Sequence, residues 1–287
     1  MLLRFTKMHG LGNDFVLLDL ISQNIRLLPE QIRELGDRRT GIGFDQLLLV
    51  EPPENPDMDF RYRIYNADGT EAEQCGNGAR CFMRFLRDRG LTTKIRIKLE
   101  TNTGSIECKL EEDGNITINM GPPALCPEQI PFAADHVSIQ YELELTSTSP
   151  THPGSQLPKS VSISTVNIGN PHAVLLVDDV SKAAVSQIGP AIENHPRFPQ
   201  RVNVGFMQVV ARNKIKLRVF ERGVGETRAC GTGACAAVVA GRLQGLLDDQ
   251  IEVMLPGGTL SVTWKGDDSD ILMTGPASRV YEGRLQI

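Results

Sequence analysis

The amino-acid sequence predicts an α+β fold of two similar halves, each a strand-rich layer around one long helix. The segments EAEQCGNGARC (71–81) and ETRACGTGACA (226–236) both contain Cys-Gly-x-Gly-Ala, 155 positions apart. Upstream of them, GLGNDFVLLDL (10–20) is similar to NIGNPHAVLLVDD (167–179), at an offset of 157. A single repeat over such a distance indicates a duplicated domain and not a short-period solenoid.

Composition bounds the class of protein. A chain of 287 residues can form one large domain or two ordinary ones. Hydrophobic residues make up 40% and charged residues 23%, as in soluble enzymes. The net charge of −5 does not indicate a basic surface that binds nucleic acid. The apolar run in MLLRFTKMHG is too short for a signal peptide, and no stretch approaches the ~20 apolar residues of a membrane span. We therefore expect a cytoplasmic protein that binds neither nucleic acid nor membranes.

The elements follow from hydrophobic periodicity. Short apolar or alternating runs predict strands at FVLLDL (15–20), QLLLV (46–50), IRIKLET (95–101) and ITINM (116–120). After the first CGNGA, helical spacing continues to Gly90, which is typical of a helix C-cap. After CGTGA, the run to Gly245 is almost entirely apolar, which predicts a central, buried helix.

Two segments indicate the domain organisation. NMGPPALCPEQIPF (119–132) contains four prolines and is the best candidate for a linker. We predict an N-terminal half over 1–125, completed by the C-terminal segment 276–287, and a C-terminal half over 126–275. TSTSPTHPGSQLPK (146–159) is rich in Ser, Thr and Pro, which predicts a mobile surface loop.

The six cysteines have spacings C-x5-C and C-x4-C, without any C-x2-C. These spacings predict neither a zinc site nor a redox dithiol, so no metal is expected. Cys81 and Cys235 fall inside the helical patterns and are predicted to be plain core residues.

Cys75 and Cys230 each stand immediately before a predicted helix. A sulfur placed there meets unpaired backbone N–H groups and the positive end of the helix dipole, which favour the thiolate and lower the pKa below its free value of ~8.5. The glycines at 76, 78, 231 and 233 would let a ligand approach the backbone, and a carboxylate could be held at the same helix N-termini. The alternative is a glycine-rich turn with an incidental buried cysteine. Two copies in equivalent halves favour the functional interpretation.

Two such thiols suit the inversion of a carbon that bears a hydrogen. Inversion needs a base on one face of the carbon and an acid on the other, and a pair of cysteines supplies both for either hand of substrate. Repulsion between like charges keeps one proton on the pair, so the two thiols are expected to titrate together. Helix N-termini directed at a substrate carboxylate would stabilise the developing enolate-like charge.

The motifs together resemble the diaminopimelate epimerase family. The segments that carry the resemblance are KMHGLGNDF (7–15), GIGFDQ (41–46), NADGTEAEQCGNGARC (66–81), GNPH (169–172), RVNVGFMQ (201–208), ERGVGETRACGTGACA (221–236), LPGG (255–258) and VYEG (280–283). The resemblance implies a pyridoxal-phosphate-independent epimerase that needs no cofactor and interconverts LL- and meso-diaminopimelate in lysine and peptidoglycan-precursor synthesis. It also implies two α/β domains of mostly antiparallel strands around a central helix, with the site in the cleft between them. The Ser/Thr/Pro-rich segment departs from the family's pattern as an insertion remote from every motif.

The resemblance assigns roles residue by residue. Cys75 and Cys230 match the two catalytic positions, and His172 and Glu221 match the pair that adjusts the thiol pKa values. The substrate-binding positions fall on Asn13, Gln46, Asn66, Gly76, Asn77, Asn170, Asn203, Glu221, Arg222, Gly231 and Thr232. The Arg222 guanidinium suits a carboxylate and the amides can both donate and accept, so the set fits an acyclic substrate with a charged group at each end.

Several of these residues also have plain structural interpretations. His172 could be a satisfied structural histidine, Asn13 and Asn170 could be turn residues, and Arg222 with Glu221 could be a surface ion pair. The resemblance further implies a homodimer, with Tyr281 of VYEG as an interface residue.

Two rival functions remain open. A proline-type racemase would also use paired cysteines, but it would need a smaller and more apolar pocket without a distal carboxylate clamp. A non-catalytic thiol sensor or metal-binding protein is the other rival, and the cysteine spacings fit neither form of it.

Overall fold

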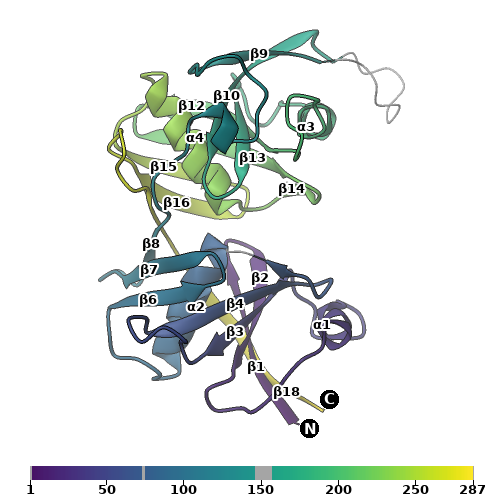
Figure 1. Cartoon of the computed structure of the whole chain (residues 1–287), viewed down its shortest axis with the longest axis vertical. Coiled ribbons are helices and arrows are strands. Elements are labelled where there is room, and N and C mark those ends of the chain that lie inside the picture. The colour runs from purple at the N-terminus through teal and green to yellow at the C-terminus, as the bar shows by residue number, and fades with distance from the viewer. Residues whose placement is uncertain (1, 73–74, 146–156, 287) are drawn as a thin grey trace. The chain divides into compact units, whose positions relative to one another are not determined.

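The computed structural model describes residues 2–72, 75–145 and 157–286. The chain forms two compact units (Figure 1): the first comprises Met1–Asn119 and Thr274–Ile287, and the second Met120–Met273. Most of the predicted surface loop, residues 146–156, lies outside the described residues.

The described part of the first unit contains ten strands or helices in sequence and a returning C-terminal strand. They are β1 (Leu2–Gly10), β2 (Asn13–Asp19), α1 (Pro29–Gly36), β3 (Gln46–Glu51), β4 (Phe60–Asn66), β5 (Glu71–Ala72), α2 (Gly76–Asp88), β6 (Arg96–Thr101), β7 (Gly104–Leu110), β8 (Ile116–Asn119) and β18 (Ser278–Gln286). The returning strand β18 pairs antiparallel with β1 along almost its whole length, so the N- and C-terminal strands lie side by side.

The second unit repeats this order. Its elements are η1 (Pro127–Gln129), β9 (Tyr141–Glu144), β10 (Ser160–Asn167), β11 (Pro171–Leu176), α3 (Val185–Glu193), β12 (Asn203–Ala211), β13 (Lys214–Glu221), β14 (Gly225–Thr227), α4 (Gly231–Leu243), β15 (Gln250–Leu255) and β16 (Gly258–Thr263). A last strand, β17 (Leu272–Gly275), includes the boundary between the units.

The pairings repeat as well, which confirms two similar, mostly antiparallel domains. In the first unit β2 and β3 are parallel, β4 is antiparallel to β3, and β4 is parallel to β6. In the second unit β11 and β12 are parallel, β13 is antiparallel to β12, and β13 is parallel to β15. Each parallel connection carries a helix, as a crossover between parallel strands requires.

The register brings the predicted site residues to one edge of each unit. Phe15 lies opposite Gln46, which lies opposite Asn66. In the second unit His172 lies opposite Asn203, and the next pair, Val204 with Phe220, puts Asn203 level with Glu221. Because β2 and β3 run parallel and β4 runs back, the starts of the first two strands and the end of the third meet at the same edge.

Both predicted long helices begin and end as the sequence indicates. Cys75 is the N-cap of α2 and Cys230 is the N-cap of α4. Beyond the C-termini, Gly90 and Gly245 have φ of +66° and +72°. The following N–H groups, of Leu91 and Leu246, donate to carbonyls inside the helix at 2.9 Å, which satisfies groups that a helix end leaves unpaired.

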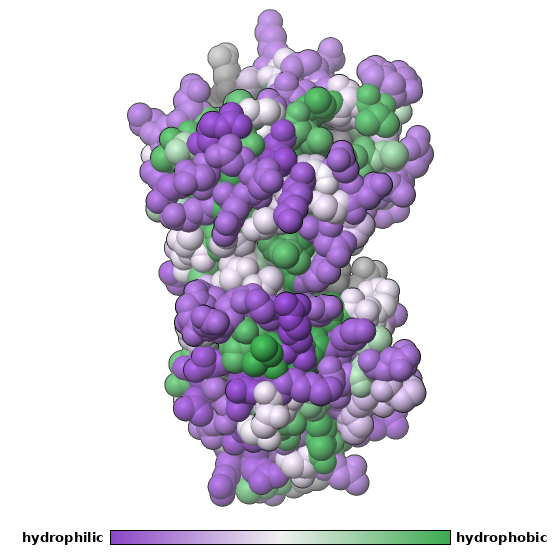
Figure 2. Space-filling view, turned by 90° about the vertical axis from the view of Figure 1, so that its left-hand side faces the viewer, coloured by the Kyte–Doolittle hydropathy of each residue, from purple (hydrophilic) through white to green (hydrophobic). Residues whose placement is uncertain are grey.

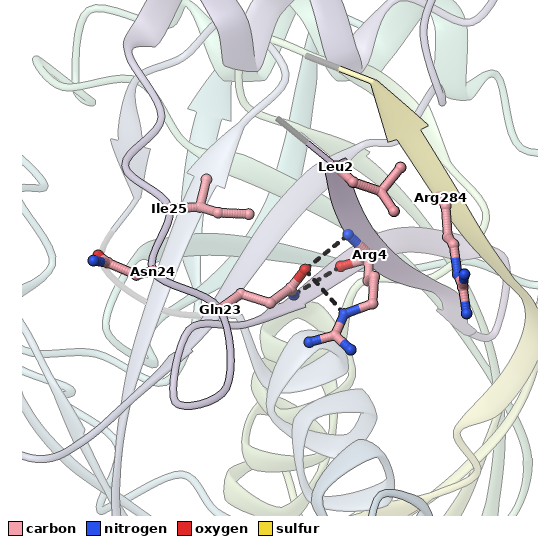
Figure 3. A pocket seen from close by; sticks show the side chains of 6 residues that line it. All are labelled: Leu2, Arg4, Gln23, Asn24, Ile25 and Arg284. Carbon is pink, nitrogen blue, oxygen red and sulfur yellow. Dashed lines mark hydrogen bonds between the residues drawn. The ribbon is translucent and has the colours of Figure 1, made fainter.

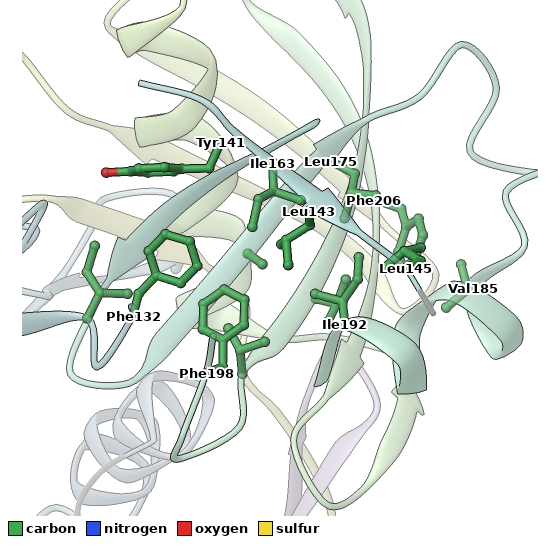
Figure 4. Close-up of a cluster of buried hydrophobic side chains, with 14 of the residues drawn as sticks. Phe132, Tyr141, Leu143, Leu145, Ile163, Leu175, Val185, Ile192, Phe198 and Phe206 are labelled. Carbon is green, nitrogen blue, oxygen red and sulfur yellow. The ribbon is translucent and has the colours of Figure 1, made fainter. Parts of the chain in front are cut away.

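Each unit has its own core. As predicted, α4 is buried along most of its length. Figure 4 shows a second cluster in the same unit, where apolar side chains of β9, β10, β11 and β12 meet α3, with Ile163, Phe206 and Ile192 among its completely buried members. Phe132 packs on Phe198 with ring centroids 4.7 Å apart, a normal distance for an aromatic pair.

The exterior is polar over most of the drawn face, with apolar residues in small separate patches (Figure 2). Among the described residues, no helix is both long enough and apolar enough to cross a membrane.

Gly78 and Gly233 serve packing within their own units, which corrects the expectation that they open the backbone to a ligand. A Cβ on Gly78 would lie 2.6 Å from the Tyr62 hydroxyl oxygen, and one on Gly233 would lie 3.0 Å from Val219 Cγ2. Both glycines are buried, so each lets its helix approach the sheet beneath it closely.

We expect Gly78→Ala to destabilise the protein by about 1–3 kcal/mol, the usual cost of an extra methyl group in a packed interior. Urea unfolding measures this change. Tyr62→Phe in the same chain removes the atom in collision and should recover part of the loss. Gly205→Ala is the matched control, because its added methyl meets no atom closer than 3.5 Å. Equal stability of Gly78→Ala and Gly205→Ala would contradict this account of Gly78.

Candidate active site

The first half-site forms around the N-terminus of α2. Cys75 is partly exposed there. Asn13 starts β2 directly after Gly12, whose φ of +90° turns the chain in a way that favours glycine. The Asn13 Oδ1 atom accepts from Cys75 Sγ at 3.7 Å and from Asn77 Nδ2 at 3.2 Å. The structure thus brings three of the predicted residues together.

Gln46 and Asn66 form a second group at the same edge. Gln46 Nε2 donates to Asn66 Oδ1 across the strands at 3.0 Å, and Asn66 Nδ2 donates to Thr70 Oγ1 at 3.1 Å. Both amides belong to residues that are only partly exposed. Their mutual bond fixes which end of each amide remains for a ligand.

Three residues of the first half were not predicted from the sequence. Arg80 is completely buried and donates to Asn77 Oδ1 at 2.9 Å. Asp45 accepts from Asn13 Nδ2 at 2.9 Å. Tyr62 donates its hydroxyl to the Cys75 carbonyl at 3.2 Å. A charged residue inside the first helical motif, where the second copy has Cys235, was the one available signal for Arg80.

The second half-site forms around the N-terminus of α4. Cys230 is only 4% exposed, and its sulfur lies 3.6 Å from Thr232 Oγ1. Glu221, the last residue of β13, lies close enough to hydrogen-bond this thiol, and its carboxylate also accepts from Thr227 Oγ1. Cys230, Thr232 and Glu221 therefore form one cluster, as the resemblance implies.

The pKa of Cys230 is raised well above its ordinary value, not lowered as the position before the helix led us to expect. Burial of the thiol is the largest cause, and the negative charge of Glu221 adds to it. Hydrogen bonds from Thr232 and from the Gly233 N–H lower the pKa but do not outweigh these two effects. The expectation was wrong because a favourable helix end acts locally, whereas desolvation depends on the whole surroundings of the sulfur.

His172 is buried and uncharged at neutral pH. Its Nε2 lies 2.9 Å from Asn170 Oδ1, and because an amide oxygen only accepts, the ring donates there. Burial, and then the nearby positive charge of Arg222, lower the pKa of His172 to about 3. Nδ1 has no hydrogen-bond partner among the described residues. His172 can therefore influence its neighbours by hydrogen bonding and not by charge.

The Asn203 side chain is hydrogen-bonded to the backbone of Arg222. The Arg222 N–H donates to Asn203 Oδ1 at 2.9 Å, and Asn203 Nδ2 donates to the Pro171 carbonyl at 3.0 Å. The Arg222 guanidinium also donates to the Gln200 carbonyl at 3.1 Å. The Asn203 amide thus connects the start of β11 with the residue that follows β13.

The buried neutral histidine predicts a pH-dependent stability. The folded-state pKa of about 3 lies below the unfolded value near 6.5, so between these values the unfolded chain binds a proton that the folded chain does not. The contribution of His172 to the free energy of unfolding is complete above pH ~6.5, and it falls by about 1.4 kcal/mol per pH unit as the pH decreases toward 3. His172→Phe should remove this slope, measured by urea unfolding from pH 7 to pH 4. Phenylalanine is a ring of similar shape that carries no titrating group, and Phe15 occupies the equivalent position in the first unit. Equal slopes in both proteins would contradict the assignment.

The two half-sites are similar in framework but differ in charge. Asn66 corresponds to Glu221, Phe15 to His172, and Arg80 to Cys235. A neutral amide therefore stands in the first half where the second half has a carboxylate beside its thiol.

A separate cavity of about 380 Å³ lies between β1, β18 and the segment after β2 (Figure 3). In it the Gln23 side chain bonds the backbone of Arg4. The cavity contains none of the predicted site residues. Within the described ranges, no group of three or more His, Cys, Asp or Glu side chains is arranged to hold a metal ion.

Comparison with known proteins identifies the relatives of this chain. A family model described as diaminopimelate epimerase matches residues 5–126 and 164–280. A diaminopimelate epimerase of Stutzerimonas stutzeri (strain A1501) is 56% identical over 287 residues, covering 100% of both chains. One from Pseudomonas entomophila (strain L48) is 57% identical over the same length, again with complete coverage of both.

Solved structures share the fold at low sequence identity. A Bacillus anthracis phenazine biosynthesis protein of the PhzF family aligns with a TM-score of 0.70 at 18% identity, covering 100% of both chains. A hydroxyproline epimerase from Agrobacterium vitis aligns with a TM-score of 0.67 at 14% identity, covering 99% of this chain and 92% of its own. A probable proline racemase from Agrobacterium radiobacter K84 gives 0.67 at 16%, with the same coverage. These likenesses concern the fold alone.

Proposed function

The chain belongs to the diaminopimelate epimerase family, and we propose that it interconverts LL- and meso-2,6-diaminopimelate with two cysteines and no cofactor. The observation that carries this proposal is the repeated placement of a cysteine as the N-cap of the long helix. Cys75 and Cys230 hold this position in two units that share their element order and strand pairings. Full-length relatives at 56% and 57% identity bear the same family name.

In the proposed reaction one thiolate removes the α-proton and the other thiol donates a proton to the opposite face. The first S–H bond forms as the C–H bond breaks, and the electron pair moves into an enolate of the substrate carboxylate. A new C–H bond then forms as the second S–H bond breaks, so the substrate gains and loses one proton. This mechanism requires one thiol on each face of the same substrate carbon. The raised pKa of Cys230 makes it a neutral thiol at neutral pH, which suits a proton donor.

We assign the surrounding polar groups to substrate binding. The N-terminus of a helix favours a bound anion, so the starts of α2 and α4 can hold a carboxylate. Arg222 provides a guanidinium for a second carboxylate, and the amides and Glu221 can hold ammonium groups. The proposed set is Asn13, Gln46, Asn66, Gly76, Asn77, Asn170, Asn203, Glu221, Arg222, Gly231 and Thr232.

Proton exchange in D2O tests the function. The purified enzyme is incubated under reducing conditions, without added cofactor, with LL- or meso-diaminopimelate, and the α-positions are followed by NMR. We expect deuterium to enter one α-position together with inversion. Parallel samples contain proline and 4-hydroxyproline, since the fold is shared with enzymes named for those substrates. Exchange only with the cyclic substrates would reassign the enzyme, and no exchange with any would refute the epimerase proposal.

We also propose a cytoplasmic homodimer that uses the exposed side chains of β18. Val280 and Tyr281 are 56% and 45% exposed. Large exposed apolar side chains of this kind can mark an interaction surface. Sedimentation analysis should give a dimer for the wild type and a monomer for Tyr281→Ala. A monomeric wild type would refute this proposal without affecting the catalytic one.

A further inference from the structure

Four side chains of the first unit form a continuous series of hydrogen bonds that passes beside Cys75. Arg80 Nη2 donates to Asn77 Oδ1 at 2.9 Å, and Asn77 Nδ2 donates to Asn13 Oδ1 at 3.2 Å. Asn13 Nδ2 then donates to Asp45 Oδ2 at 2.9 Å. Cys75 meets this series at Asn13 Oδ1, where its sulfur lies 3.7 Å away.

The ends of the series determine the direction of every bond in it. A guanidinium can only donate and a carboxylate can only accept, whereas an asparagine amide can do either by a half-turn of its side chain. With Arg80 at one end and Asp45 at the other, each amide between them has one orientation that satisfies both neighbours. Any reversal would set two donors or two acceptors against each other. The oxygen of Asn13 therefore points to the sulfur.

Both ends are themselves held in place. Arg80 is completely buried, and its Nε donates to the Pro276 carbonyl at 3.2 Å. Asp45 accepts from Arg38 Nη2 at 2.7 Å and from the Asp14 N–H at 3.0 Å. Hydrogen bonds to ionised groups are shorter and stronger than neutral ones, so these ends can impose their direction on the amides.

We propose that Arg80 and Asp45 are positioning residues that fix the amide orientations of Asn13 and Asn77 and thereby present an oxygen acceptor to Cys75. The S–H of Cys75 then has an acceptor while it carries a proton. Once the proton leaves, the same oxygen becomes available to a donor of the substrate, such as an ammonium group. This inference deepens the proposed epimerase function and rests on it for the role of the substrate.

Among the residues that the structure describes, this arrangement occurs in the first unit alone. Cys235 stands at the position equivalent to Arg80, and Val202 at the position equivalent to Asp45, so the second unit has neither charged end. There the His172 ring donates to the Asn170 oxygen instead. The two thiols therefore have differently fixed neighbours, although their helices begin alike.

A double-mutant cycle with Asp45→Asn and Arg80→Gln tests the proposal. Each single variant keeps one charged residue, Arg80 or Asp45, that still fixes the direction of the hydrogen bonds in the series. We therefore expect kcat for inversion to fall by no more than about threefold. The double variant has no such end, and we expect a loss about tenfold beyond the product of the single effects, as for coupled neighbours. Asp37→Asn is the control in the same loop, because the Asp37 carboxylate accepts from the neighbouring Arg39 and Thr40, and this variant should match the wild type.

The second readout is the alkylation of Cys75 as a function of pH, followed by mass spectrometry with iodoacetamide in a Cys230→Ala background. A reversed Asn13 would present N–H groups to the sulfur and favour the thiolate, so the double variant should shift the midpoint to lower pH. Purely multiplicative losses of kcat with an unchanged alkylation midpoint would overturn the proposal. If the enzyme with both cysteines intact does not invert diaminopimelate, the proposed function is refuted, and a shifted midpoint in the double variant would still support the positioning role.

Asp45→Lys supplies an independent test if the buried Arg80→Gln does not fold. The Asp45 side chain is 43% exposed, so the fold should accept this change. Lysine can only donate hydrogen bonds. At position 45 it would require Asn13 to present its oxygen there, whereas Arg80 at the other end requires the opposite orientation of the two amides. We expect at least a tenfold loss of kcat for Asp45→Lys, against at most threefold for Asp45→Asn. Equal activities of these two variants would overturn the proposal.

Discussion

Cys75→Ala and Cys230→Ala are each expected to reduce the rate of diaminopimelate inversion by about 10³–10⁴-fold. Positioned proton transfer contributes up to about 10⁴-fold to such reactions, and neither alanine can take or give a proton. Inversion needs both a base and an acid, so the loss of either thiol stops the complete reaction. Isomer ratios followed by NMR or by chiral chromatography measure the effect.

The two variants should differ in the partial reaction that survives. A remaining thiolate can still exchange the α-proton of the isomer that it faces, and it returns a deuteron to the same side. We therefore expect each variant to exchange one isomer without inversion, and the two variants to prefer opposite isomers. Cys126→Ala is the control, since this exposed cysteine lies outside both helix starts, and it should retain full activity. Inversion within tenfold of wild type in either active-site variant would refute the two-thiol mechanism.

Local physics explains why much of the fold could be predicted from sequence. The start of each long helix follows from the Cys-Gly-x-Gly-Ala turn, and its end follows from Gly90 or Gly245, which need only neighbouring residues. The strand at 46–50 likewise follows from a short apolar run. The duplication was visible because both copies retain these local signals in the same order.

The electrostatics of the site could not be predicted in the same way. Asn13 and Asp45 are far apart in the sequence, and so are Arg80 and Pro276, yet the fold brings each pair into hydrogen-bond contact. The pKa of Cys230 depends on how completely its surroundings exclude water, a property of the whole second unit. The local pattern correctly located the thiol at a helix start but gave the wrong direction for its pKa.

The packing of glycines shows the same limit. Gly78 was expected to face a ligand because glycine permits close approach, and the pattern could not say what approaches. In the structure the neighbour is the hydroxyl of Tyr62, from a strand thirteen residues before Cys75 in the sequence. A glycine motif thus predicts a close contact without identifying its partner.

Glu221→Gln is expected to lower the pKa of Cys230 by about one to two units, as the removal of one like charge near a titrating group does. The sign follows from the charges: the carboxylate of Glu221 disfavours a second negative charge on the sulfur, and a neutral amide does not. Burial remains, so the pKa should stay above the ordinary thiol value. Iodoacetamide alkylation of Cys230 against pH, in a Cys75→Ala background, measures the midpoint. Glu226→Gln is the matched control, because that carboxylate pairs with Arg218 and should leave the midpoint unchanged.

The same substitution should alter the pH dependence of turnover. When Cys230 acts as the donor it must carry a proton, so a lower pKa moves the basic limb of the kcat/KM profile to lower pH. Above the new pKa, kcat/KM should fall about tenfold for each pH unit. A further variant, Glu221→Asn, gives the second half the residue type that Asn66 provides in the first. If the carboxylate is what keeps the proton on Cys230, this variant should bring the pKa values of the two thiols closer together. The shared proton should then no longer prefer Cys230. An unchanged alkylation midpoint in both Glu221 variants would show that burial alone sets the pKa of Cys230, and that the carboxylate serves the substrate instead.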